Sequence, residues 1–221
     1  MRLLLIRHGQ TPANVDGRLN TAAPGPGLTE LGERQAAGIP VALQGDVIDG
    51  IFVSTLLRTH VTAAPLAADR RIDAVELPGI HEIGAGSLED RSDRESVHRY
   101  HRTAFAWGLG DLDVVMPGGV DGHEFFERFD ASIATVSALH ESGTAVVVSH
   151  GAAIRVWIAG RVTNVPPSFS GDREIDNTGV IELDGNPDDG WVLLSWQGSP
   201  VGGSDLADEA ALDPTGESLR D

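Results

Sequence analysis

Short apolar runs alternate with amphipathic stretches along most of this chain. The runs have the length of a buried strand and are too short to span a membrane. They predict strands at residues 2–6, 51–53 and 144–149, with a weaker one at 72–77. Capping residues and apolar positions at helical spacing predict helices over residues 29–40, 56–68, 123–140 and 152–162. Strands and helices therefore alternate.

The remaining segments complete the expected fold. Residues 177–183 and 191–196 predict two late strands that form an antiparallel edge, whereas residues 80–120 lack clean periodicity and are interpreted as a lid insertion. We therefore expect a three-layer α/β/α sandwich with a mostly parallel central sheet. Residues 1–197 would form a single domain, followed by an acidic tail rich in Gly and Ser over residues 198–221.

Composition narrows the class of protein. The chain has 221 residues, of which 41% are hydrophobic and 22% charged, as is usual for a soluble globular protein. It contains no cysteine, which excludes disulfide bonds, thiolate catalysis and cysteine-ligated metals. The amino-terminal apolar run is too short for a signal peptide, and no stretch is long enough to cross a membrane. We expect a cytoplasmic protein.

The charge of the chain bears on its partners. A formal net charge of −17 disfavours nucleic acid and anionic membranes, because the summed field repels phosphate groups. An anionic ligand must then be captured by local positive groups. All 16 basic residues are arginine, whose planar guanidinium suits phosphate and carboxylate, although a lack of lysine is also explained by coding bias.

Cationic residues follow the ends of three predicted strands. Arg7 and His8 end the first strand, Ser54 follows the second with Arg58 one helical turn later, and His150 follows the third. The carboxyl ends of parallel strands share one edge of a sheet, where ligands bind in open α/β folds. Two arginines and two histidines would thus converge on a small volume. Nearby helix amino termini add N–H donors, so the expected ligand is a phosphoryl group.

Longer motifs surround these residues in a characteristic order. They are Arg7-His8-Gly9-Gln10-Thr11 with Asn14, Leu28-Thr29-Glu30-Leu31-Gly32, Ser54-Thr55-Leu56-Leu57-Arg58-Thr59, His81-Glu82-Ile83, and Val148-Ser149-His150-Gly151. Together they resemble the signature of the histidine phosphatase superfamily, the phosphoglycerate-mutase-like proteins. The resemblance covers roughly residues 2–183.

The resemblance implies a role for each matching residue. His8 would be the nucleophile that becomes phosphorylated, and Glu82 would be the proton donor. The phosphoryl oxygens would be held by Arg7, Asn14, Arg58 and His150. The imidazole can attack phosphorus in line while the cationic groups stabilise the equatorial oxygens. This chemistry needs no metal and no cofactor.

Some positions leave alternatives open. Gly119-Val120-Asp121 stands where many members have Gly-Glu-Ser, and His60 stands where Gln is common, which leaves substrate binding undecided. Glu82 could instead be a solvated loop carboxylate, and Asn14 a turn-forming residue. The other histidines form no metal-spaced set with nearby carboxylates, namely His81, His98, His101, His123 and His140.

An arginine-rich stretch follows Glu82. If residues 91–102 are helical, Arg91, Arg94, His98 and Arg102 fall on one face. This face could bind a second anionic group of the substrate, or it could be a solvated surface with an ion pair between Arg91 and Glu95.

The residues and the resemblance together predict a metal-independent phosphatase. It would hydrolyse a small-molecule phosphate ester, a phosphorylated metabolite, through a phosphohistidine intermediate. A phosphomutase of phosphoglycerate type is the alternative, although the segment after Glu82 lacks the Arg-His-Tyr-Gly type of continuation of those mutases. A non-catalytic module that binds a phosphorylated ligand is more distant, because His8 and the arginines are all present. A homodimer is left open.

Overall fold

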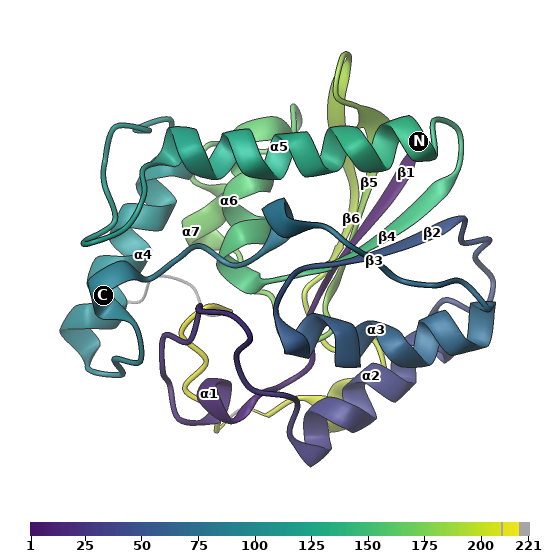
Figure 1. Ribbon diagram of the computed structural model, residues 1–221, viewed down its shortest axis with the longest axis horizontal. Helices are drawn as coiled ribbons and strands as arrows, with labels where there is room; N and C mark the ends of the chain where they lie inside the picture. The colour runs from purple at the N-terminus through teal and green to yellow at the C-terminus, as the bar shows by residue number, and fades with distance from the viewer. Residues whose placement is uncertain (209, 217–221) are drawn as a thin grey trace.

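A six-stranded sheet forms the centre of the molecule (Figure 1). The computed structural model describes residues 1–208 and 210–216. The strand order is β3-β2-β4-β1-β5-β6. The strands are β1 (Arg2–Arg7), β2 (Gly50–Val53), β3 (Val75–Glu76), β4 (Thr144–Ser149), β5 (Val180–Asn186) and β6 (Gly190–Gln197).

Strand directions agree with the expected fold class. β3, β2, β4 and β1 run parallel, whereas β5 is antiparallel to β1 and β6 is antiparallel to β5. The inner parallel strands are buried on both faces, which explains their continuous apolar sequences. The predicted mostly parallel sheet with an antiparallel edge is confirmed.

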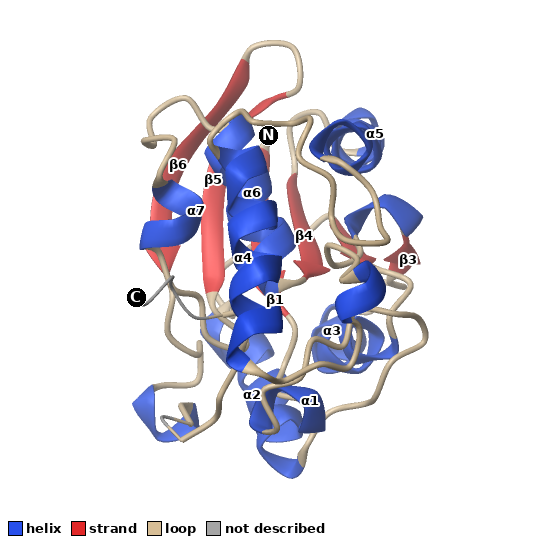
Figure 2. Ribbon diagram, turned by 90° about the vertical axis from the view of Figure 1, so that its left-hand side faces the viewer, coloured by secondary structure: helices blue, strands red, loops and turns tan. Residues whose placement is uncertain are grey.

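Helices cover both faces of the sheet (Figure 2). Leu4 and Ile6 of β1 pack in one core with α2 (Glu30–Ala42) and α3 (Leu57–Arg70). Leu3 and Leu5, which point to the other face, belong to a second core. That core includes residues of α4 (Arg94–Gly108), α5 (Gly122–Leu139), α6 (Gly151–Arg161) and α7 (Phe169–Asp172). The three expected layers are therefore present.

The segment between residues 80 and 120 is more regular than expected. It contains α4, which has 15 residues, and the short 3₁₀ helix η2 (Gly86–Leu88), and it follows directly on η1 (Pro78–Ile80). The helix considered for residues 91–102 is thus present and runs from Arg94 to Gly108. Tyr100, Ala104 and Trp107 recur at helical spacing on its buried face, but polar residues such as His101 and Thr103 lie among them and obscure the pattern.

The structure differs from the expected helices at two more places. The predicted loop after β1 contains the short helix α1 (Pro12–Val15), which Thr11 caps. Helix α2 continues two residues past Pro40. Pro40 lies in the last turn of α2. Because proline has no backbone N–H, one helical hydrogen bond is missing there, and the helix ends two residues later.

The chain after β6 returns to the sheet. The 3₁₀ helix η3 (Ser204–Leu206) contacts α2, and the carbonyl of Leu206 accepts a hydrogen bond from Gln35 of α2 at 2.8 Å. Asp213 then reaches Arg7 at the end of β1. Within the described part of the chain, no helix is long and apolar enough to cross a membrane.

Candidate active site

The ends of β1, β2 and β4 bring the predicted site residues together. Arg7 pairs with Ser149, and Val53 pairs with Val148, so the residues that follow lie at one edge of the sheet. The backbone N–H of His8 donates to the carbonyl of Ser149 at 3.0 Å. The imidazole rings of His8 and His150 are 5.1 Å apart between their centroids. The convergence expected from the parallel strand ends is therefore observed.

One ring nitrogen of His8 is engaged in a hydrogen bond to the backbone. Its Nδ1 lies 2.8 Å from the carbonyl oxygen of Gly9, which can only accept, so Nδ1 carries the proton. Nε2 is then the unprotonated nitrogen. Burial lowers the pKa of His8 well below its ordinary value, and the positive charges of Arg58 and Arg7 lower it further. His8 is thus a neutral imidazole at neutral pH, with a lone pair on Nε2.

His150 presents the opposite nitrogen. Ser54 Oγ lies 2.7 Å from Nε2 of His150 and accepts a hydrogen bond from the backbone N–H of Leu56 at 3.2 Å. Ser54 Oγ also lies 3.2 Å from Thr59 Oγ1, so its proton has two acceptors within reach. When Ser54 donates to Nε2, the imidazole proton is on Nδ1. Burial, followed by the charge of Arg58, lowers the pKa of His150 well below its ordinary value. In this tautomer His150 offers a neutral N–H donor. From the sequence, Ser54 was predicted only to follow the second strand, and its hydrogen bond to His150 was not predicted.

Arg7 and Arg58 are both buried, with 0% and 3% of their surface exposed. Burial lowers the pKa of Arg58 to about 10, the charge of Glu82 opposes this effect, and Arg7 adds to it. Nη2 of Arg58 donates to the carbonyl of Asn20 at 3.1 Å. Among the described residues, Nε of Arg7, Nε of Arg58 and Nδ1 of His150 are buried and have no hydrogen-bond partner.

Glu82 lies at the amino terminus of α6 and is 1% exposed. Its Oε1 accepts backbone hydrogen bonds from Ile83 and Ala153, each at 2.9 Å, and its Oε2 accepts one from Ala152 at 3.3 Å. The two carboxylate oxygens are thus held in place by three backbone N–H groups, two of which belong to the first turn of α6. Glu82 is therefore a buried, oriented group and not a solvated loop carboxylate.

Asn14 has a structural role and also lies beside Arg7. Its Oδ1 accepts the backbone N–H of Thr11 at 2.9 Å, as a capping residue of α1 does. Its Nδ2 donates to Asp213 Oδ1 at 2.9 Å, and the same carboxylate contacts Arg7. Asn14 is thus close to the predicted site, and one of its two amide N–H groups is engaged by Asp213.

Two cavities flank these residues. One, of about 520 Å³, is lined by neighbours of Arg58 and Glu82 in the chain, including Leu56, His81 and Gly84. The other, of about 410 Å³, is lined by Asp176, Asp208 and Asp213, among others. The second cavity is lined by four carboxylates, because Glu174 also contributes, whereas the first is lined only by that of Glu89. The first cavity is therefore the less repulsive side for a phosphate ester.

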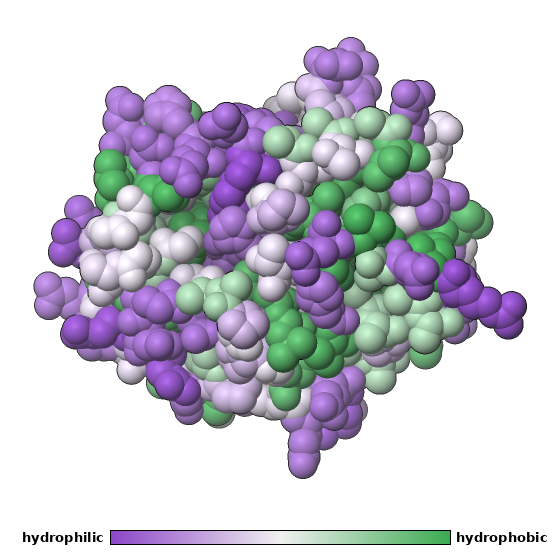
Figure 3. Space-filling model, viewed as in Figure 1, coloured by the Kyte–Doolittle hydropathy of each residue, from purple (hydrophilic) through white to green (hydrophobic). Residues whose placement is uncertain are grey.

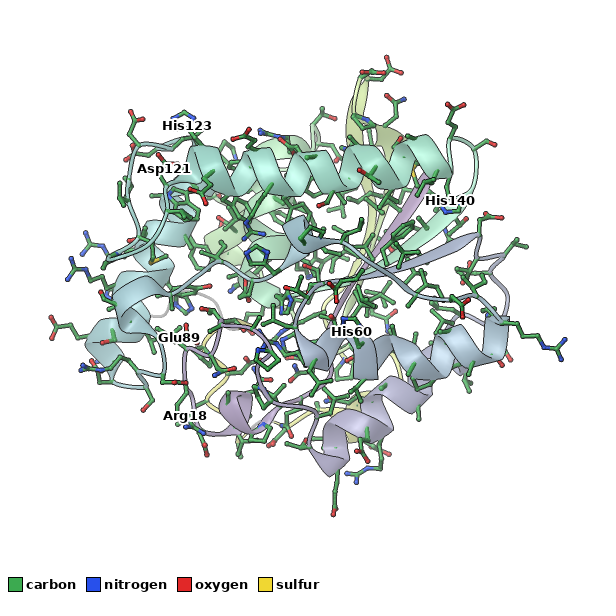
Figure 4. All side chains as sticks on the ribbon, in the orientation of Figure 1. Arg18, His60, Glu89, Asp121, His123 and His140 are labelled. Carbon is green, nitrogen blue, oxygen red and sulfur yellow. The ribbon has the colours of Figure 1, made fainter. Side chains whose placement is uncertain are left out.

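The remaining histidines are dispersed. Figure 4 shows His60 on α3, and His123 and His140 at opposite ends of α5. Within the described residues, no group of three or more histidine and carboxylate side chains could hold a metal ion.

The arginines of α4 lie away from its buried face. Arg94, His98 and Arg102 are exposed, and Arg91 pairs with Asp93 at 2.8 Å instead of Glu95. Tyr100 and Trp107 occupy the buried face of the helix. The part of the surface over α4 is correspondingly hydrophilic, whereas more apolar residues cover α3 (Figure 3). The exposed arginines thus resemble a solvated helix surface.

The geometry agrees with a comparison against protein families. The model of the histidine phosphatase superfamily (branch 1) matches residues 3–198. The chain belongs to the histidine phosphatase superfamily.

Several known histidine phosphatases and related proteins are similar to it. Adenosylcobalamin/alpha-ribazole phosphatase of Escherichia coli is 33% identical over 75% of this chain and 81% of its own length. PE-PGRS family protein PE_PGRS11 of Mycobacterium tuberculosis is 39% identical over 91% of this chain, which spans only 37% of that protein. Matching relatives also include proteins named as phosphoglycerate mutases.

Solved structures support the same family. The alpha-ribazole phosphatase from Shigella flexneri has a TM-score of 0.72 and 29% sequence identity, covering 92% of this chain and 98% of that chain. The predicted family and an enzyme of the histidine phosphatase type are therefore confirmed.

Proposed function

We propose that this histidine phosphatase hydrolyses a small phosphorylated metabolite in the cytoplasm through a phosphohistidine at His8. One observation carries this proposal: Nε of Arg7, Nε of Arg58 and Nδ1 of His150 are buried donors without a partner among the described residues. Buried donors are costly unless they are paired, and a phosphoryl group would supply acceptor oxygens to all of them. These residues converge on His8, whose Nε2 carries a lone pair.

The proposed reaction has two steps. Nε2 of His8 attacks phosphorus, the P–O bond to the leaving group breaks, and Glu82 gives its proton to the leaving oxygen. Water then attacks the phosphohistidine, gives a proton to Glu82, and releases inorganic phosphate together with neutral His8. Arg7, Arg58 and His150 stabilise the charge on the equatorial oxygens in both steps.

The proton that Glu82 gives to the leaving oxygen needs a source in every turnover. A phosphate ester that binds as the monoanion would bring one proton with it. We expect the proton to arrive with the substrate in this form.

A phosphomutase would use the same groups, because it differs only in which hydroxyl accepts the phosphoryl group from His8. The phosphatase relatives favour transfer to water. The proportions of inorganic phosphate and isomerised ester separate the two activities. Release of one phosphate for each alcohol formed would support the phosphatase.

Trapping of the intermediate tests the mechanism. Wild-type protein quenched during turnover of a ³²P-labelled substrate should carry an acid-labile, base-stable label, and His8→Ala should carry none. His98→Ala, which changes an exposed histidine of α4, is the matched control and should be labelled like wild type. Full turnover by His8→Ala would reject the proposal.

A further inference from the structure

Arg128 of α5 contacts the backbone of the segment that carries Glu82. Its Nη1 donates to the carbonyl oxygens of Gly79 at 2.5 Å and His81 at 2.8 Å, and its Nη2 donates to that of Glu82 at 3.1 Å. A single guanidinium therefore fixes the carbonyls of residues 79, 81 and 82. The planar fork of arginine allows this, whereas lysine has only one nitrogen.

Burial of the charged guanidinium of Arg128 costs free energy. Burial lowers the pKa of Arg128 to about 10, and the charge of Glu82 opposes this effect. None of the ion pairs found between described residues includes Arg128. One face of its guanidinium instead lies 5.0 Å from the ring centroid of Phe125. Desolvation is thus compensated by carbonyl dipoles, an aromatic ring and the more distant charge of Glu82, without a direct ion pair.

The same backbone segment fits closely against α5. A Cβ atom at Gly79 would lie 2.1 Å from the carbonyl oxygen of Arg128 and 2.2 Å from Ser132 Oγ. Only glycine permits this approach, which brings the carbonyl of Gly79 within reach of the arginine. The segment is therefore held by close packing and by the guanidinium at once.

The position of this backbone determines where the carboxylate of Glu82 lies. The side chain is fixed at its far end by Ala152 and Ala153 of α6, and its own carbonyl is fixed by Arg128 of α5. Two different helices thus constrain the two ends of one residue. A shift of the carbonyl would rotate the Cα–Cβ bond and move the carboxylate relative to a leaving group.

We propose that Arg128 is a positioning residue for the general acid Glu82. The inference rests on the proposed function, because it assigns Arg128 to the same proton transfer. No hydrogen bond joins Arg128 to His8 or to the three unpartnered donors, although its charge is one of the causes that lower the pKa of His150. Its hydrogen bonds therefore connect it to the reaction through the segment that carries Glu82.

Leaving-group dependence tests this role. The variants Arg128→Met and Arg128→Lys would be compared with wild type on glycerol 2-phosphate, an alkyl ester, and on p-nitrophenyl phosphate. The alkyl leaving group needs a proton, whereas p-nitrophenolate hardly does. We expect Arg128→Met to lower kcat/KM for the alkyl ester by about 10- to 100-fold and for the aryl ester by less than about threefold. Arg128→Lys should fall in between.

A double variant shows whether the effect passes through Glu82. In a Glu82→Gln background, Arg128→Met should lower kcat/KM for the alkyl ester by less than about twofold, because the acid is already absent. Arg161→Met is the matched control, since Arg161 also lies over a ring, that of Phe126 at 4.2 Å, but pairs with Asp130. It should show no leaving-group dependence.

The outcomes separate this inference from the proposed function. Equal losses on both esters, or losses that multiply with those of Glu82→Gln, would overturn the role of Arg128. If Arg128→Met does not fold, Arg128→Lys provides the same comparison. Wild-type protein that releases no phosphate from either ester, and that forms no phosphohistidine, would instead overturn the function.

Discussion

The carboxylate of Asp213 lies against the guanidinium of Arg7, 206 positions earlier in the chain. Its Oδ1 accepts a hydrogen bond from Nη2 of Arg7 at 2.5 Å, and its Oδ2 contacts Nη1. Burial lowers the pKa of Arg7, but the charge and hydrogen bonds of Asp213, together with the charges of Glu82 and Asp176, outweigh this effect and raise it above its ordinary value. The contact engages both terminal nitrogens of Arg7 and leaves Nε without a partner among the described residues.

We predict that Asp213→Asn destabilises the free protein. The substitution would remove the carboxylate that pairs with the fully buried Arg7. Asp213 itself is 14% exposed, so we expect the free energy of unfolding to fall by an amount near the lower end of the range for broken buried pairs, about 3 kcal/mol. A bound phosphate would restore negative charge beside Arg7. Inorganic phosphate should therefore raise the Tm of the variant more than that of wild type.

The measurement is urea unfolding, followed by thermal unfolding with and without phosphate. Asp205→Asn, at an exposed position of η3, serves as the control and should behave like wild type. An Asp213→Asn protein as stable as wild type would show that the ion pair contributes no net stability.

Glu82→Gln should slow the enzyme in a manner that depends on the leaving group. Glutamine keeps the shape but cannot donate the proton, so kcat/KM for an alkyl phosphate should fall by about 100-fold or more. The loss on p-nitrophenyl phosphate should be much smaller. Initial rates on the two esters provide the measurement, and equal losses would assign Glu82 another role.

Metal chelators should leave activity unchanged. The charge of the phosphoryl group would be neutralised by Arg7 and Arg58, with His150 as a neutral donor, so a metal ion is not required. Initial rates after dialysis against EDTA test this expectation. Activity that disappears with EDTA and returns with Mg²⁺ or Zn²⁺ would contradict it.

The core of the site could be predicted because it depends on strand ends. Arg7, His8 and His150 directly follow or end apolar runs, and parallel strands of one sheet place such residues at a common edge. Local sequence thus determined both the strands and the residues beyond them. The fold class followed from the same alternation of strands and helices.

The supporting contacts could not be predicted, because they join distant segments through polar groups. Arg128 reaches residues 79–82 from a helix more than 40 positions later, and Asp213 reaches Arg7 from the far end of the chain. Neither contact leaves a periodic pattern. Helix α4 was predicted only as a condition over residues 91–102, because polar residues such as His101 interrupt the apolar spacing of its buried face.

His101 provides a test of stability against pH. It is 5% exposed, its Nε2 contacts the carbonyl of Pro214, and its ring stacks on Phe105. Burial, followed by the charge of Arg155, lowers its pKa from 6.5 to about 4. His101 therefore stays neutral in the folded protein at pH values where it is already protonated in the unfolded chain.

The sign of the effect follows from this difference. Above pH 6.5 His101 is neutral in both the folded and the unfolded state, so it does not change the free energy of unfolding. Between pH 6.5 and about 4 it is protonated in the unfolded chain but not in the folded protein. Stability is therefore lost as the pH falls through this range, and the share of His101 at pH 5 is about 2 kcal/mol. His8 and His150, whose pKa values are also lowered, add losses of the same sign.

Replacement of His101 by glutamine should make the profile flatter. Glutamine keeps an N–H donor for Pro214 but does not titrate, so the decrease in unfolding free energy from pH 8 to pH 5 should be about 2 kcal/mol smaller than in wild type. Urea unfolding at several pH values gives both profiles. His98→Gln, which changes an exposed neighbour on the same helix, should leave the slope unchanged. Parallel profiles for His101→Gln and wild type would mean that burial does not hold His101 neutral. The contact of His101 with Pro214 would then not explain any loss of stability at acid pH.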